Sequence, residues 1–259
     1  MAIIGAILGD ISGSRYEFVR PANLNWKQCE LFTDDCYCTD DTVMTLATKF
    51  AIRNSVSFAD AYRKFGKQYP NAGYGCTFES WIDNPIALPY GSYGNGSAMR
   101  CSYIGEYFDN EKDVVTYAIK SAECTHNHPE GIKGAVVTAM CIYMAKRGAT
   151  KSDIFNYVKR HYPKEKYKYS IEHTLEKYRE TYKWDITCQG SVPVAIECFL
   201  ESEDYESFLR NVYSLSCDMD TICAIGGGVA EEFYKGTGFN NASLLSRYLD
   251  NYLLRCCYV

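Results

Sequence analysis

Apolar side chains recur at helical spacing throughout Ile132-Lys133-Gly134-Ala135-Val136-Val137-Thr138-Ala139-Met140-Cys141-Ile142-Tyr143-Met144. Positions three and four residues apart share one face of an α-helix, whereas a half-buried strand alternates with a period of two. The same helical spacing returns in four other stretches, which begin at Ile4, Val43, Val192 and Ile222. Alternating patterns between turn residues are hard to find, so the sequence predicts an all-α fold.

More polar helices are predicted over 113–122, 152–161, 170–182, 204–214 and 242–254. Residues 70–98 contain several glycines and prolines and are predicted to form a long irregular region, which in a compact domain is often functional. No internal repeat or low-complexity linker divides the chain. We therefore predict one domain over residues 1–259.

Composition excludes some classes of protein. A net charge of −5 argues against a protein that grips nucleic acid through its phosphates. No segment reaches the roughly 20 apolar residues that span a bilayer, and the apolar N-terminus lacks a basic flank and stops at Asp10. The 13 cysteines are scattered, without the spacing of a zinc site, and suit a reducing compartment. We expect no membrane association and a cytoplasmic location.

Two acidic motifs, Thr39-Asp40-Asp41-Thr42 and Asp218-Met219-Asp220-Thr221, each directly precede an apolar helical stripe. Helix capping is the simple explanation, since Thr and Asp are preferred N-caps and acids favour the first turn. Capping, however, needs one acceptor, and each motif offers two carboxylates and a hydroxyl. Residues two apart on a regular helix point about 200° away from each other. Asp218 and Asp220 are therefore expected to converge only in an unwound turn before the helix.

These donors indicate a particular kind of metal. Carboxylates and hydroxyls without His or Cys are hard oxygen ligands, which suit Mg²⁺, Mn²⁺ or Ca²⁺ rather than zinc. The charges of the four aspartates would be neutralised by two divalent cations. The residues alone do not bring position 40 near position 220.

Five motifs in order resemble those of the ADP-ribosylglycohydrolase family, which includes dinitrogenase-reductase-activating glycohydrolases. The resemblance runs nearly end to end, and the motifs are Gly5-Ala6-Ile7-Leu8-Gly9-Asp10 with Tyr16-Glu17, Thr39-Asp40-Asp41-Thr42, Tyr93-Gly94-Asn95-Gly96-Ser97-Ala98-Met99-Arg100, Thr125-His126-Asn127-His128-Pro129-Glu130-Gly131 and Asp218-Met219-Asp220-Thr221-Ile222.

The resemblance implies a compact, single-domain orthogonal helical bundle with two Mg²⁺ or Mn²⁺ ions at a cleft. The matching metal ligands are Thr39, Asp40, Asp41, Asp218, Asp220 and Thr221. The implied reaction is hydrolysis of the glycosidic bond between ADP-ribose and an acceptor, most often an arginine side chain on a protein, by a metal-activated water at the distal ribose. Serine-linked, O-acetyl or other small-molecule conjugates are the alternative. The implied catalytic residues are Glu17, Asp41 and Asp220, although Glu17 also suits an ordinary exposed glutamate.

The substrate is implied to contact a glycine-rich loop and one histidine. These residues are Ser92, Tyr93, Gly94, Asn95, Gly96, Ser97 and His126. Glycines let a backbone approach a ligand closely, but such a loop is more often a turn, and His126 suits an N-cap or a core position equally. Arg100 is compatible with a phosphate contact or with an ion pair to an acid.

The sequence departs from the family pattern at Ser216-Cys217, where two glycines are common, and at Tyr103, where a proline is common. Neither change removes a metal ligand, but each affects the cleft floor or the acceptor pocket. A non-catalytic, crystallin-like relative that binds ADP-ribose is the third possibility, and it has no physical need for four clustered carboxylates. The expected partners are ADP-ribose and an ADP-ribosylated protein or small molecule, and we expect a monomer.

Overall fold

A computed structural model of the chain describes residues 2–258, and these contain helices but no β-strand. The all-α prediction is confirmed; the only bridge-type pairing within these residues is an isolated one between Gly94 and Thr187. The helices are, in chain order, α1 (Ala2–Ser14), α2 (Asp40–Asn54), α3 (Phe58–Gln68), α4 (Cys76–Asp83), α5 (Gly96–Met99), α6 (Ser102–Tyr107), α7 (Glu111–Glu123), α8 (Pro129–Lys146), α9 (Lys151–His161), α10 (Leu175–Thr181), α11 (Cys188–Leu200), α12 (Tyr205–Tyr213), α13 (Met219–Tyr234), α14 (Asn241–Tyr248) and α15 (Asn251–Tyr258).

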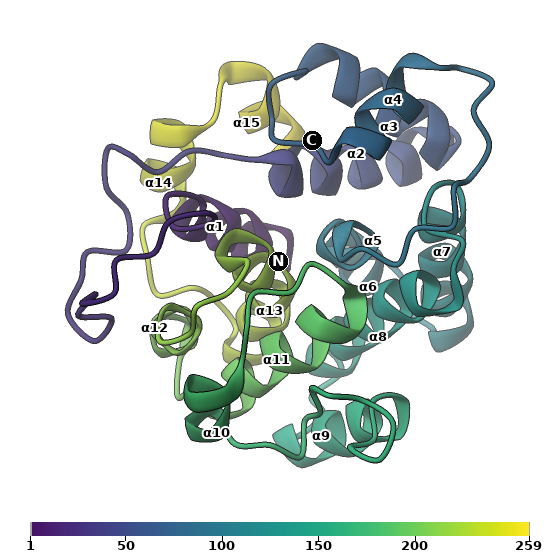
Figure 1. Cartoon of the computed structure of the whole chain (residues 1–259). Coiled ribbons are helices and arrows are strands. Elements are labelled where there is room, and N and C mark those ends of the chain that lie inside the picture. The colour runs from purple at the N-terminus through teal and green to yellow at the C-terminus, as the bar shows by residue number, and fades with distance from the viewer. Residues whose placement is uncertain (1, 259) are drawn as a thin grey trace.

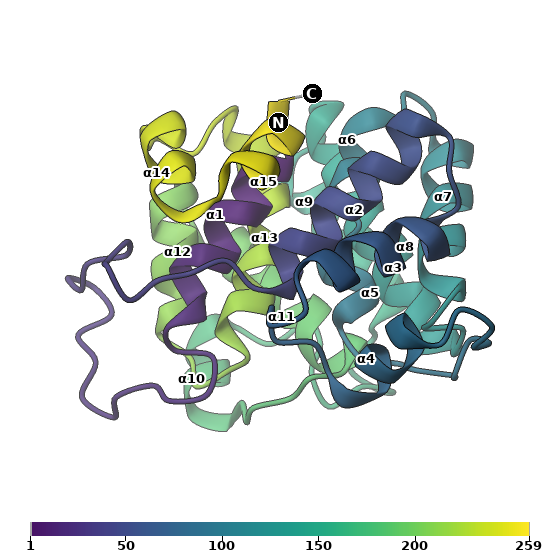
Figure 2. The same ribbon diagram turned by 90° about the horizontal axis from the view of Figure 1, so that it is seen from above.

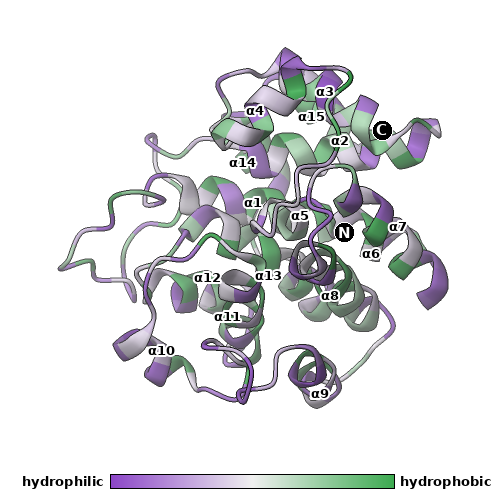
Figure 3. Ribbon diagram, turned by 45° about the vertical axis from the view of Figure 1, so that its right-hand side comes forward, coloured by the Kyte–Doolittle hydropathy of each residue, from purple (hydrophilic) through white to green (hydrophobic). Residues whose placement is uncertain are grey.

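Helices α1 and α13 lie side by side at the centre of the molecule, with α2, α8, α11 and α12 around them (Figures 1 and 2). Both central helices are buried over most of their length, which explains why they are apolar on every side. Figure 3 shows the same division, because α11 and α13 carry mostly apolar residues whereas the outer helices α9 and α10 are more polar.

Glycines allow α1 and α13 to approach at backbone contact. A Cβ atom added at Gly5 would stand 2.4 Å from the Gly227 carbonyl oxygen, and one at Gly9 would stand 2.3 Å from the Cys223 carbonyl oxygen. Because these contacts are with the backbone of α13, a side chain at either glycine would require one of the two helices to shift. Each glycine inside the α13 stripe costs about 1 kcal/mol of helix stability. Close packing explains them, since Gly227 lies against Gly5 of α1 while Gly226 and Gly228 lie against Phe208 and Ile142.

Two predicted helices and one predicted loop have different boundaries in the structure. The stretch 242–254 forms α14 and α15 instead of one helix, because Asp250 accepts hydrogen bonds from the backbone N–H groups of Tyr252 and Leu253 and so starts a new helix. The helix predicted from residue 170 begins at Leu175, where Thr174 caps it. The region 70–98 contains α4, which buries Phe78, Trp81 and Ile82.

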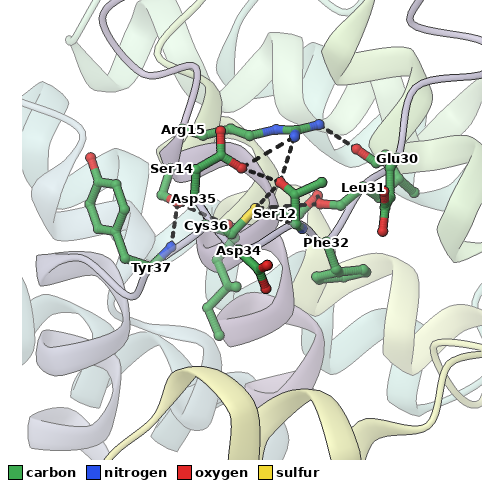
Figure 4. Close-up of polar contacts among 12 residues, drawn as sticks. Ser12, Ser14, Arg15, Glu30, Leu31, Phe32, Asp34, Asp35, Cys36 and Tyr37 are labelled. Carbon is green, nitrogen blue, oxygen red and sulfur yellow. Dashed lines mark hydrogen bonds and ion pairs between the residues drawn. The ribbon is translucent and has the colours of Figure 1, made fainter.

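The segment between α1 and α2 is long, has no helix and projects from the bundle (Figures 1 and 2). Its return towards α2 is fixed on the end of α1, as Figure 4 shows. The Ser14 hydroxyl accepts a hydrogen bond from the Tyr37 N–H at 3.0 Å, and the Arg15 guanidinium donates to Thr33 Oγ1 and to the Glu30 carbonyl. These contacts fix the path of the chain after α1, where Glu17 lies, and the start of α2 at Asp40. No helix within residues 2–258 is long and apolar enough to cross a bilayer.

Candidate active site

A cleft of about 670 Å³ opens between the start of α2, the loops around residues 73–78 and 90–96, and the start of α13. We call it the main cleft. The predicted site residues that line it are Glu17, Asp40, Asp41, Ser92, Tyr93, Gly94, Asn95, Gly96, His126, Asp218, Asp220 and Thr221. Chain folding therefore brings position 40 near position 220, which the sequence left open.

Thr39 and Ser97 are not among the residues that line the main cleft. The Ser97 side chain is fully buried and its hydroxyl donates to the Gly131 carbonyl oxygen at 2.7 Å, so it faces α8. The Thr39 side chain is also buried and caps α2, since its Oγ1 accepts a hydrogen bond from the Asp41 N–H. Thr39 and Ser97 were assigned to the site because they belong to the same motifs as Asp40 and Gly96, which do line the main cleft.

Carboxylates from three parts of the chain converge at one end of the main cleft. Single carboxylate oxygens of Glu17, Asp218 and Asp220 lie within 4.8 Å of one another. Asp41 joins them through Thr221, whose Oγ1 donates to Asp41 Oδ2 at 3.2 Å. Together with Asp40, which lines the same cleft, these carboxylates form what we call the acidic centre.

The convergence of Asp218 and Asp220 differs from the sequence-based expectation. Only Asp218 lies outside the helix, with φ −67° and ψ 84°, whereas Asp220 lies in the first turn of α13. Because the Asp218 backbone is not helical, its side chain need not follow the 100° rotation per residue that would point it away from Asp220. One non-helical residue is enough to bring both carboxylates together.

Asp10 is a buried acid that the sequence reasoning did not assign to the site. Its carboxylate accepts hydrogen bonds from the backbone N–H groups of Thr39 and Thr42, both at 3.0 Å, and from both threonine hydroxyls. The side chain of Asp10, on α1, thus caps the N-terminus of α2. Its position at the end of the first apolar stripe was visible, but nothing local indicated its partners in α2.

Within residues 2–258, no ion pair gives the acidic centre a cationic partner. Burial, together with repulsion from neighbouring carboxylates, holds the pKa values of Asp40, Asp41 and Asp220 well above their usual range. Burial raises the pKa of Asp10 to about 6, and burial with the charge of Asp218 raises that of Glu17 to about 7. Asp41 Oδ1 is buried without a hydrogen-bond partner. This excess of buried oxygen donors fits divalent cations, which would supply the missing positive charge.

The glycine-rich loop is fastened to both α11 and the acidic centre. Asn95 donates its backbone N–H to the Ile186 carbonyl oxygen at 2.8 Å, and its side-chain amide to Asp218 Oδ2 at 2.6 Å and to Ser191 Oγ at 2.9 Å. On the other side, the Gly94 N–H donates to Ser92 Oγ. A ligand held by this loop would therefore sit at a fixed distance from Asp218.

His126 lies behind the glycines of this loop. Its Nδ1 is hydrogen-bonded to Thr125 Oγ1 at 2.8 Å, and a Cβ at Gly96 would stand 3.3 Å from its Nε2. Burial holds the pKa of His126 well below its ordinary value, so the imidazole is neutral at pH 7. His126 is not an N-cap, since His128 caps α8, but it is a buried, hydrogen-bonded histidine that also lines the main cleft.

Arg100 lines the cleft but forms no ion pair with an acid in the described chain. Its guanidinium lies 4.1 Å above the Tyr62 ring and donates to the Ser121 carbonyl oxygen and to Thr125 Oγ1. The hydrogen bond to Thr125 links it to the residue that orients His126. The ion pair allowed by the sequence is therefore absent, and Arg100 supports the floor of the cleft.

Aromatic side chains in the main cleft were missed by the sequence reasoning. Tyr74, Phe78 and Tyr90 line its interior, and Phe18 and Trp184 line its mouth, where they are 74% and 48% exposed. The glycine-rich character of 70–98 indicated a functional region without singling out its aromatics. The exposure of Phe18 and Trp184 has no sequence signal, because a large apolar residue usually predicts the core.

Comparison with known proteins agrees with this geometry. The family model for ADP-ribosylglycohydrolase matches residues 1–230, which include both acidic motifs, the glycine-rich loop and His126. The chain belongs to the ADP-ribosylglycohydrolase family. The family match ends within α13, before α14 and α15.

Individual proteins that are similar to this chain have names related to that of the ADP-ribosylglycohydrolase family. The chain is 26% identical over 306 residues to ADP-ribosylhydrolase ARH3 of Mus musculus, with 90% of this chain and 82% of the relative covered. It is 27% identical over 304 residues to the Homo sapiens protein of that name, with 90% and 84% covered. A solved structure titled ADP-ribosylglycohydrolase-related protein complex has a TM-score of 0.74 at 20% identity and covers 98% of this chain and 93% of its own, which shows the shared fold. Family and relatives together support an ADP-ribosyl hydrolase.

Proposed function

We propose that the protein hydrolyses the glycosidic bond between ADP-ribose and a side chain of a modified protein. The observation that carries the proposal is the acidic centre in a cleft that the glycine-rich loop also lines, with the loop fastened to Asp218 by Asn95. Such a cleft offers one region for a diphosphate and another for the anomeric carbon of a ribose. Arginine is the acceptor first expected, and serine-linked or O-acetyl conjugates are its alternatives.

The proposed metal ligands are Asp40, Asp41, Asp218, Asp220 and Thr221, with Thr39 beside them. The unpartnered Asp41 Oδ1 and the crowded carboxylates support two Mg²⁺ or Mn²⁺ ions. When bound, these cations would supply Lewis acidity toward ribose oxygens and toward water. Asp10 contributes indirectly, because it holds the start of α2 in place through Thr39 and Thr42.

Glu17 is the proposed general acid and base of the reaction. Burial is the main cause that raises the pKa of Glu17, which favours a side chain that can hold a proton and exchange it with the reacting oxygen. The side chain is half-buried at the junction of the main cleft and its mouth, next to Asp218 and Asp220. In the oxocarbenium-like transition state, the nearby carboxylates also stabilise positive charge at the ribose.

The other end of the cleft is proposed to hold the ADP part. His126, neutral and oriented by Thr125, offers Nε2 beside the glycine loop, where Ser92, Tyr93, Gly94 and Gly96 line the wall. The aromatic rings of Tyr74, Phe78 and Tyr90 provide a surface on which a purine ring would stack.

The test is release of free ADP-ribose from arginine-linked and serine-linked proteins with Mg²⁺, Mn²⁺ or EDTA. We expect metal-dependent release that Asp220→Asn reduces at least about 100-fold while the fold persists. Asp83→Asn, which changes an exposed acid outside the cleft, is the matched control. Equal, background-level release by the wild type and by Asp220→Asn on every conjugate would favour the non-catalytic binding protein.

A further inference from the structure

A smaller hollow of about 330 Å³ adjoins the main cleft and shares part of its wall. We call it the side pocket. Its lining residues are Tyr16, Glu17, Phe18, Arg20, Trp184, Ser216 and Cys217, of which Glu17, Phe18 and Trp184 also line the main cleft. The two hollows therefore meet at the carboxylate proposed to exchange the proton.

The side pocket lies where the acceptor side of the glycosidic bond would be, because the main cleft is proposed to hold the ADP-ribose side. A glycosidic bond that is cleaved beside Glu17 has ribose on one side and the acceptor on the other. The glycine-rich loop and His126 occupy the ADP side. Ser216 and Cys217, which replace the family's common glycines and directly precede Asp218, line the side pocket.

Arg20 gives the side pocket a positive charge. Its Nε donates to the Tyr213 carbonyl oxygen at 3.0 Å, which anchors the guanidinium, and Nη1 reaches the Pro21 carbonyl oxygen at 3.4 Å. No ion pair in the described part of the chain involves Arg20, and Glu17 is the only carboxylate that lines this pocket. With two divalent cations in the acidic centre, the four aspartate charges would be balanced. Among the residues that line the side pocket, Glu17 would then carry the one negative charge, and it forms no ion pair with Arg20 in the described part of the chain.

The rim indicates a polypeptide rather than a small leaving group. Phe18 and Trp184 stand at the border of both hollows, and Phe18 continues into Val19, which is 75% exposed. Exposed aromatic side chains bury large areas when a partner covers them, and interfaces use them for this reason. A free amino acid or acetate would leave most of this surface in water.

Resting on the proposed function, we propose that the side pocket receives the acceptor peptide and that Arg20 selects modified residues flanked by a carboxylate. The guanidinium is anchored at Nε and offers its remaining donors to an aspartate or glutamate next to the modified residue. Such a partly exposed ion pair acts mainly on recognition and on the rate of encounter.

The test compares hydrolysis of two matched ADP-ribosylated peptides, one with Asp and one with Asn beside the modified residue. We expect the wild type to prefer the acidic peptide about fivefold in kcat/KM, with the preference falling as salt rises. Arg20→Gln should abolish the preference, Arg20→Lys should retain part of it, and Arg20→Glu should reverse it. Lys27→Gln removes one exposed charge from the same segment and should leave the preference unchanged.

Three readouts separate the possible failures. Release of ADP-ribose from neither peptide, nor from a conjugate with a small leaving group, would reject the proposed function itself. Release from both peptides at equal rates, or an unchanged preference in Arg20→Glu, would reject the role of Arg20 alone. Melting temperatures of the Arg20 variants show whether loss of the Tyr213 contact has unfolded the segment, and Arg20→Lys keeps the charge as a second check.

Discussion

Gly13 in α1 lies against Asp220 in α13 so closely that a Cβ atom added at Gly13 would stand 2.5 Å from the Asp220 Cα. The contact is with backbone, which has no flexible end to move aside. The position of a proposed metal ligand is therefore fixed by the absence of a side chain on a neighbouring helix. The glycine contacts between α1 and α13 end at the acidic centre.

Gly13→Ala should displace the start of α13 and disturb the acidic centre. We expect a loss of about 1–3 kcal/mol in the free energy of unfolding, as for other overpacked sites, and weaker Mg²⁺ binding. Gly105→Ala is the control, because its Cβ would meet the Ala139 carbonyl oxygen at 2.4 Å, away from the cleft. Denaturant unfolding and Mg²⁺ titration should show similar destabilisation in both variants but weakened metal binding in Gly13→Ala alone.

Glu17→Gln should lower kcat by about 100-fold or more while leaving the fold intact, because glutamine cannot exchange the proton. The wild-type pH–rate profile should contain a limb from titration of the Glu17 carboxyl, and the variant should lack that limb. Glu123→Gln, at the exposed end of α7, is the control and should keep the wild-type profile. An unchanged pH–rate profile in Glu17→Gln would assign the titration to another group.

Local patterns in the sequence predicted the helices and both acidic motifs, because capping residues and apolar stripes act over neighbouring positions. The same patterns did not reveal Asp10 as the cap of α2, since its partners Thr39 and Thr42 lie far along the chain. Nor did they show that Ser97 faces α8 while Asn95, two residues earlier, reaches Asp218. Which side of a short loop faces a cleft depends on tertiary contacts that periodicity does not contain.

Metal removal should make stability depend on pH in a definite direction. The acids of the centre have raised pKa values, about 6 for Asp10 and about 7 for Glu17, so the folded state binds more protons than the unfolded state between about pH 4 and pH 7. Stability in EDTA should therefore fall as pH rises through this window. Added Mg²⁺ should raise the melting temperature more at pH 8 than at pH 5, and Asp220→Asn should reduce that difference. An equal effect of Mg²⁺ at both pH values would contradict the assignment.

Glu197 in α11 provides a pH effect that is independent of the cleft. Burial and its hydrogen bond with Glu201 raise the pKa of Glu197 to about 9, and Glu201 also accepts a hydrogen bond from the Leu175 N–H. An unfolded glutamate ionises near pH 4, so the folded state holds an extra proton from there to about pH 9. The contribution of this group to stability should therefore fall as pH rises over that range. Glu197→Gln keeps a hydrogen-bond donor without a titrating proton, and should flatten the pH dependence and be more stable than the wild type at pH 8. Glu176→Gln, on the exposed face of α10, is the control, and equal pH slopes for wild type and Glu197→Gln in denaturant unfolding would show that Glu197 ionises normally.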